Sequence, residues 1–171
     1  MNMTTALLLS LPALLAAQVK DIDGWEPTKW GMSVEQARDA LGGRAAETTP
    51  EKDVGLIRRL RIPKFEVSQI PLEIWFEFSP DTSELRSVQM TVQDGVGRGG
   101  AFERLKQLLI EKYGPQSDQD IKTERNAFGS TRVDKTTLWR MPSTSILLTW
   151  SDYGDIGYVS VRYSKVVKSG L

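Results

Sequence analysis

The run Ile70–Phe78 alternates strictly between two kinds of side chain, and no other feature of the chain constrains its fold as much. Successive strand residues point to opposite faces of a sheet, so this period of two predicts a strand with one buried face. The buried face would carry Leu72, Ile74, Phe76 and Phe78, and the opposite face Glu73, Trp75 and Glu77. A second alternating run, Leu85–Val92, follows turn-forming residues at 79–82, which predicts an antiparallel hairpin.

The other predicted elements come in the same order in both halves of the chain. In the first half, Ser33 and Gln36 form a capping-box pattern that opens a short helix ending at Gly42. In the second half, apolar positions at helical spacing over residues 102–113 predict a longer helix that ends at Gly114. Strands are predicted at residues 54–62, 70–78 and 85–92, and again at 131–141, 144–151 and 156–163. We interpret the polar residues 116–130 as a loop, and the glycines at 95, 97, 99 and 100 as a flexible connection.

This repeated order predicts an α+β fold made by tandem duplication of a unit of one helix and three antiparallel strands. The two units would span about residues 25–98 and 99–167. One helix covers only one sheet face, and a unit of this size is marginal alone, so we expect the two units to share a core. One long sheet and two packed sheets both satisfy this requirement.

An uncharged apolar run, residues 6–17 (ALLLSLPALLAA), precedes the polar sequence that begins at Gln18. It predicts a secretory signal peptide cleaved near Ala17, leaving residues 18–171 as a single domain in the periplasm or outside the cell. The run is shorter than the ~20 residues of a transmembrane helix and contains Pro12, so we expect no transmembrane segment. A buried amino-terminal helix is the alternative interpretation.

The composition lacks two of the residue types that most often act in catalysis. The chain has no Cys and no His, which excludes disulfides, thiolate catalysis and a Ser-His-Asp triad. Its 22 basic and 22 acidic residues balance, which argues against a nucleic-acid-binding protein. We therefore expect no catalytic residues, no cofactor and no metal site; Asp152 and Asp155 are better explained as turn residues than as cation ligands.

The stretch from Trp25 to Leu41, with Lys29-Trp30-Gly31-Met32-Ser33 before a short helix, resembles the opening of many small exported bacterial proteins of unknown function. The layout of a helix followed by strands is similar to that of SmpA/BamE-type assembly lipoproteins and of secreted β-lactamase inhibitory proteins, which consist of two tandem helix-and-sheet units. The resemblance implies an accessory or binding protein of the cell envelope, and it carries over no catalytic residue.

Five residues are the candidate binding residues: Glu73, Trp75, Glu77, Arg59 and Arg61. The two glutamates share a strand face and lie roughly 13 Å apart, beyond the ~5 to 9.5 Å of a glycosidase pair. With Trp75 between them they would instead form one wall of a sugar-binding groove. Arg59 and Arg61 are expected on one face, with Arg58 on the other, where they would meet an anionic lipid, a polyanionic glycan or an acidic protein. An ordinary solvated sheet face is the alternative for both groups.

These observations predict a non-enzymatic binding or accessory protein of the bacterial cell envelope, whose partner is an envelope protein or a cell-wall component. Two alternatives stay open. One is a glycan-active enzyme that uses carboxylates, with Trp75 as a platform for the sugar. The other is an exported protein that inhibits an enzyme by blocking it.

Overall fold

The computed structural model describes residues 21–53, 55–93, 97–125, 131–153 and 157–167; the expected signal peptide and Asp155 lie outside these ranges. A helix followed by four strands occurs twice along the chain. The elements are α1 (Val34–Ala40), β1 (Ala46–Asp53), β2 (Leu56–Val67), β3 (Ile70–Phe78), β4 (Leu85–Val92), α2 (Arg98–Tyr113), β5 (Asp118–Arg125), β6 (Thr131–Arg140), β7 (Thr144–Asp152) and β8 (Gly157–Lys165). Neither of these helices has the length and apolar character needed to cross a membrane.

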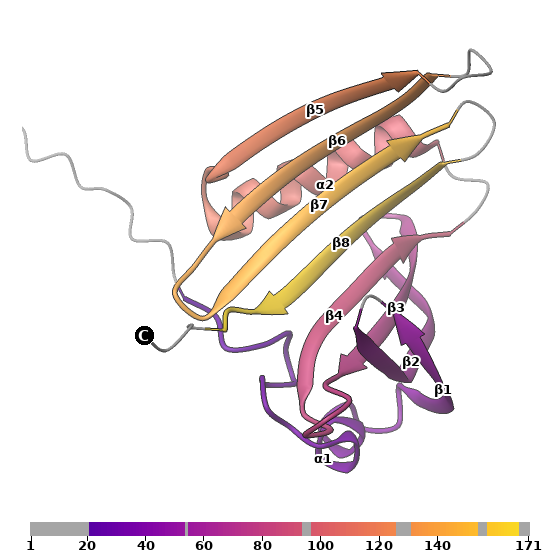
Figure 1. Ribbon diagram of the computed structural model, residues 1–171, viewed down its shortest axis with the longest axis vertical. Helices are drawn as coiled ribbons and strands as arrows, with labels where there is room; N and C mark the ends of the chain where they lie inside the picture. Colours follow the sequence, from indigo (N-terminus) through magenta and orange to yellow (C-terminus); the bar gives the residue numbers. More distant parts are fainter. Residues whose placement is uncertain (1–20, 54, 94–96, 126–130, 154–156, 168–171) are drawn as a thin grey trace, which may run out of the picture.

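All eight strands form one antiparallel sheet in the order β1-β2-β3-β4-β8-β7-β6-β5. The two halves join at its centre, where β4 pairs with β8 (Figure 1). The α+β prediction is confirmed, and of the two arrangements left open the chain adopts the single sheet. The strands predicted at residues 70–78 and 85–92 have the bounds of β3 and β4, and they pair as an antiparallel hairpin, as expected.

The prediction of three strands per half is wrong, because each half has a fourth strand at its outer edge. β5 lies inside residues 116–130, whose polar composition predicts a loop. Every residue of β5 is exposed, and β1 is exposed at six of its eight positions, so neither strand has a buried face to produce an alternating pattern. Their backbone pairing with β6 and β2 forms them instead.

Two further boundaries differ from prediction. β2 continues past residue 62 to Val67, which brings Phe65 against the core. α2 begins at Arg98, so Gly99 and Gly100 lie in its first turn rather than in a flexible connection.

The start of α1 follows the predicted capping box. The Ser33 hydroxyl accepts a hydrogen bond from the Gln36 amide at 3.3 Å, and the Gln36 side chain accepts one from the Ser33 amide at 3.0 Å. The helix ends before Gly42, whose φ of +60° is a left-handed conformation that glycine adopts without strain.

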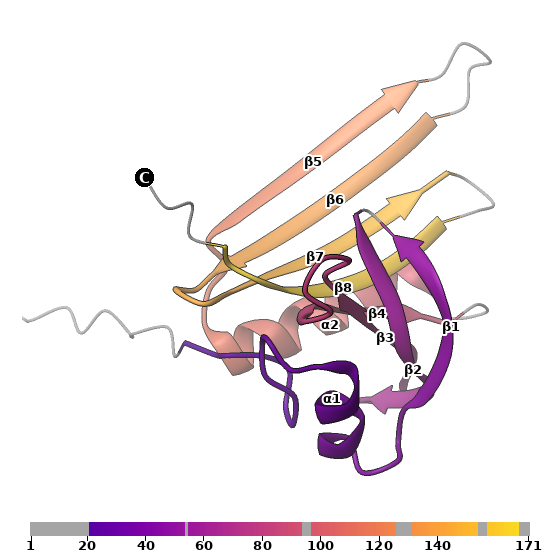
Figure 2. The ribbon, with the colours of Figure 1, turned by 60° about the horizontal axis from the view of Figure 1, so that its bottom comes forward.

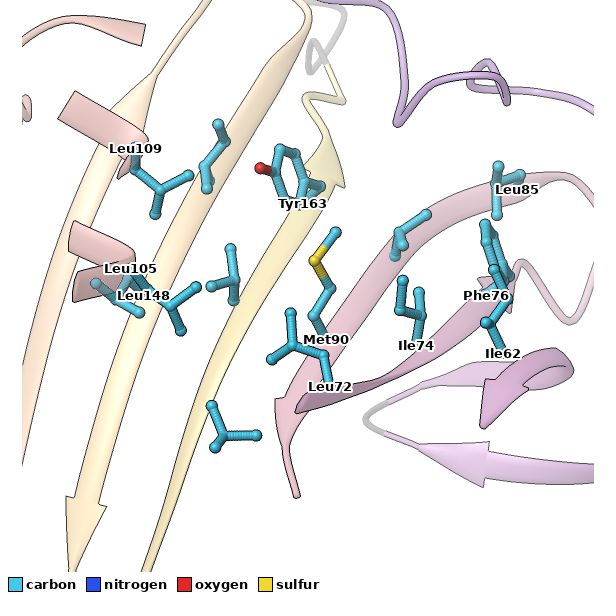
Figure 3. Packing of buried hydrophobic residues seen from close by; sticks show 14 of the residues in the cluster. Ile62, Leu72, Ile74, Phe76, Leu85, Met90, Leu105, Leu109, Leu148 and Tyr163 are labelled. Carbon is cyan, nitrogen blue, oxygen red and sulfur yellow. The ribbon is translucent and has the colours of Figure 1, made fainter. Parts of the chain in front are cut away.

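Both helices lie on the same side of the sheet (Figure 2). Residues from α1, α2 and both halves of the sheet contribute to one hydrophobic cluster, part of which Figure 3 shows. Two tryptophans fix loops to this core. Trp30 Nε1 donates to Thr144 Oγ1 at 2.7 Å and ties the segment before α1 to β7, while Trp139 Nε1 donates to the Gly114 carbonyl at 2.9 Å, at the end of α2.

Candidate functional site

The candidate residues of β3 lie on the sheet face opposite the helices, which we call the helix-free face. The register places Trp75 opposite Gln89 of β4 and Gln89 opposite Arg162 of β8, so these three side chains form a row across the joint between the two halves. Glu77 lies one row away, opposite Arg58 of β2. The described residues place no helix on this face.

An ionic cluster surrounds Glu77 on this face. Arg162 Nη2 lies 3.3 Å from Glu77 Oε1, 3.0 Å from Asp53 Oδ2 and 2.6 Å from Gln89 Oε1. Arg58 makes a matching set of contacts: its Nη2 lies 2.9 Å from Asp53 Oδ2 and 3.0 Å from Gln89 Oε1, and its Nε lies 3.5 Å from Glu77 Oε1. Two carboxyl groups therefore share two guanidinium groups, and we call these five residues the Glu77 cluster.

The contact between Asp53 and Arg162 requires a strongly curled sheet. These residues belong to β1 and β8, which are four strand positions apart. In a flat sheet that separation would be roughly 19 Å, at about 4.8 Å per strand, which is too far for an arginine and an aspartate to meet. The β1–β2 hairpin therefore folds over the helix-free face and covers Glu77, whose side chain has no exposed surface.

Burial separates the protonation behaviour of the two carboxyl groups. It raises the pKa of Glu77, an effect that the charge of Arg162 opposes and that the neighbouring Asp53 carboxyl reinforces. Burial also acts to raise the pKa of Asp53, but its interaction with Glu77 and the charges of Arg58 and Arg162 outweigh that effect and lower its pKa overall. As the pH rises, Asp53 therefore loses its proton before Glu77, which stays protonated to higher pH.

Trp75 lies between two arginines beside this cluster. The guanidinium carbons of Arg58 and Arg61 are 5.2 and 5.1 Å from the centre of its ring, within the range of cation–π attraction. Arg61 also forms a short ion pair with Glu73. The structure thus places four of the predicted residues on the helix-free face, where Arg61 contacts Trp75 and Glu73, and Arg58 contacts Trp75 and Glu77.

The expected placement of the arginines is wrong in one respect. A bulge between Arg58 and Leu60 inserts an extra residue into β2, so Arg58 and Arg61 share the helix-free face. Arg59 is the extra residue: its Nη2 contacts Glu47 Oε1 at 3.1 Å, and Glu47 also pairs with Arg38 of α1. Arg59 is therefore separated from the other candidates.

Sequence reasoning did not identify Asp53, Gln89 and Arg162 as partners of Glu77. The alternation of β4 and β8 does assign Gln89 and Arg162 to polar faces, because apolar residues flank both. No local pattern reveals that β4 pairs with β8 or that β1 folds back over the sheet, and those two events create the cluster.

The second half of the helix-free face is a broad surface of mixed character. Leu138 and Leu147 lie opposite each other on β6 and β7 and are half-buried, with Thr136 and Thr149 in the neighbouring row. Tyr158, near the start of β8, is 41% exposed. This surface combines apolar, hydroxyl and aromatic groups.

Both glutamates of the candidate site have cationic partners. Glu77 is buried and Glu73 is held by Arg61, so neither carboxyl group faces solvent without a cationic partner. Within the described ranges, no group of three or more acidic side chains is placed to hold a metal ion. Comparisons of the chain with protein-family models, with curated proteins and with solved structures found no match.

Proposed function

We propose that this protein is a non-enzymatic binding protein of the bacterial cell envelope, exported to the periplasm or secreted, and that it binds an envelope protein or a cell-wall component. Its binding surface is the helix-free face. The observation that carries the proposal is the placement of Trp75 between Arg58 and Arg61 on a sheet face that the helices leave uncovered. Trp and Arg are the residue types that dominate binding hot spots.

Three properties of the sequence support this assignment. The apolar run at residues 6–17 is typical of exported proteins. The absence of Cys and His leaves few routes to catalysis. Balanced overall charge favours a partner recognised by shape and by a few fixed contacts over a polyanion such as nucleic acid.

We also propose that the chain arose by tandem duplication of a helix-plus-strands unit. The repeated order of one helix and four strands supports this origin, as does the central pairing of β4 with β8, the last strand of each half. Such an origin accounts for the continuity of the eight-stranded sheet across the two halves.

Site-specific photocrosslinking in the native host tests the binding surface. A photoreactive residue is placed at Tyr158 or Leu138 on the helix-free face, and at Glu111, an exposed position on α2, as the control. We expect one dominant adduct with an envelope component from the first two positions and none from Glu111. Adducts from Glu111 alone, or from none of the three, would refute the assignment of this face.

The same cells test compartment and residue contributions. We expect the mature chain in the envelope or secreted fraction with an amino terminus at or near Gln18; an intact chain in the cytoplasm contradicts export. Arg61→Ala should weaken capture of the partner by about tenfold, the loss expected for one charged hot-spot contact, whereas Arg104→Ala on exposed α2 should leave it unchanged. Equal capture by both variants would remove Arg61 from the binding surface.

A further inference from the structure

A cavity lies on the helix side of the sheet, where the two halves of the molecule meet. Its volume is 690 Å³. Figure 3 shows residues of its walls, with Leu105 and Leu109 of α2 on one side, Met90 of β4 on the other, and Tyr163 of β8 between them. Residues 21–29 line its remaining side.

The placement of the two helices explains why this space is not filled by the protein. α2 packs on β7 and β8, whereas α1 contacts β2 in the first half. Met90 and Val161 lie opposite each other at the β4–β8 joint and face the region between these two layers. Protein interiors have few voids larger than a water molecule, and ligand sites typically measure about 300 to 1,000 Å³, so this space has the dimensions of a ligand site.

The walls are apolar and the rim is charged with both signs. Most of the wall consists of aliphatic and aromatic side chains, among them Trp25, Phe65, Leu72, Met90, Leu105 and Val161. Among the lining residues, Lys29 and Lys112 are exposed, as are Asp23 and Glu26. The cavity therefore reaches the surface at a rim that offers two cations and two anions; a further rim residue, Asp21, already binds Ser143.

Two tyrosine hydroxyls add a polar point within the apolar wall. Tyr113 and Tyr163 are buried, and their hydroxyl oxygens lie 3.5 Å apart. Burial, reinforced by Tyr113, raises the pKa of Tyr163 well above its usual range, so its hydroxyl stays a neutral donor. Neutral donors in such a wall suit an ester or hydroxyl group better than a second hydrocarbon chain.

We propose that this cavity binds a phospholipid with one acyl chain and a zwitterionic head group. A methylene occupies about the volume of a water molecule, roughly 30 Å³, so a 16-carbon chain fills roughly 480 Å³ and leaves space for its ester linkage. Lys29 and Lys112 face the phosphate, and Asp23 and Glu26 face the ammonium group. The site is separate from the helix-free face, so this proposal does not depend on the function proposed above.

Titration of the protein recovered from its host with palmitoyl-lysophosphatidylethanolamine tests the proposal. Calorimetry should give one molecule bound per chain, and tryptophan fluorescence should change because Trp25 lines the cavity. Trp25→Phe should reduce that fluorescence change while calorimetry still reports binding. Absence of binding overturns the proposal.

Two variants separate the acyl site from the head-group site. Leu109→Trp places a larger side chain in the cavity and should weaken binding by about a hundredfold; a thermal melt confirms that this variant folds. Lys112→Gln should weaken binding of the lysophospholipid about tenfold and leave binding of uncharged monopalmitoyl glycerol unchanged. Lys106→Gln is the matched control, because Lys106 lies on the same helix but binds Gln119 outside the cavity.

The remaining outcomes identify other occupants. Equal affinity for the lysophospholipid and for palmitate would overturn the zwitterionic head group. A dimer that persists in excess lipid and that Leu109→Trp disrupts would show that a second copy of the chain, and not the lipid, occupies the cavity. Unchanged binding by Leu109→Trp would show that lipid binds elsewhere; each of these results refutes the proposal while leaving the test of the helix-free face unaffected.

Discussion

Replacing Arg162 by Met should destabilise the protein by about 2 to 3 kcal/mol at pH 7. Arg162 Nη2 contacts Asp53, Glu77 and Gln89 within 3.3 Å, and its removal leaves two carboxyl groups with Arg58 as their one guanidinium partner in the Glu77 cluster. Removing one member of a fully buried ion pair costs about 3 to 5 kcal/mol. The side chains of Arg162 and Asp53 are each 23% exposed, so water recovers part of that loss.

Urea denaturation followed by tryptophan fluorescence measures this change. With an m-value of about 2 kcal/mol per molar urea, the midpoint should fall by about 1 to 1.5 M. Arg140→Met is the matched control: Arg140 lies in β6, two strands from β8 in the sheet, and its contact with Asp118 is 3.8 Å long between side chains that are 62% and 60% exposed. Its loss should cost no more than about 0.5 kcal/mol.

A double-variant cycle tests the physical reasoning behind the magnitude. In a Glu77→Gln background, Asp53 is the one carboxylate of the Glu77 cluster that loses an arginine partner. Arg162→Met should therefore lower the free energy of unfolding by at least about 1 kcal/mol less than in the natural sequence. The loss should also become smaller as the pH falls, because burial raises the pKa of Glu77 and a protonated Glu77 leaves one carboxylate fewer without its arginine. If Arg162→Met costs no more than Arg140→Met, or the same in both backgrounds, the cluster does not stabilise the fold as argued.

Four further outcomes are expected. Because Glu77 has a raised pKa in the folded protein, folding takes up a proton, so stability should decrease as pH rises from about 4.5 through that raised pKa. Urea midpoints measured across pH 4 to 8 should show this decrease in the natural protein and not in Glu77→Gln. Parallel curves for the two proteins would contradict the raised pKa. Asp53 has a lowered pKa and should have the opposite effect. Its contribution to stability is present above pH about 3.8 and is lost as the pH falls below that value. Ser33→Ala removes the cap of α1 and should cost about 1 kcal/mol, which lowers the melting temperature by about 2 to 4 °C; an unchanged melting temperature would show that packing alone holds this helix. Trp139 is 1% exposed, and Trp139→Phe removes the group that donates a hydrogen bond to the Gly114 carbonyl. The free energy of unfolding, measured by heat or urea, should fall by about 2 to 3 kcal/mol. A loss under about 0.5 kcal/mol would show that this hydrogen bond does not stabilise the fold.

Much of the candidate site was predictable because it lies on one strand. The alternation of Ile70–Phe78 assigned Glu73, Trp75 and Glu77 to one face, and β3 has that face opposite the helices. Arg61 joined them as the residue opposite Trp75. Arg59 did not, because a bulge changes the side-chain alternation of β2 and depends on how β2 pairs with β3, which the sequence of β2 does not specify.

The sequence by itself determined what neighbouring residues decide among themselves: the faces of β3 and β4, the cap of α1, the end of α2 before Gly114, and the repeated order of a helix before strands. Those features arise from side-chain periodicity and from hydrogen bonds between residues three or four positions apart. Tertiary structure decided the pairing of β4 with β8, the two exposed edge strands and the burial of Glu77. Asp53 and Arg162 are 109 positions apart, so their contact, and with it the Glu77 cluster, exists only after the sheet has curled.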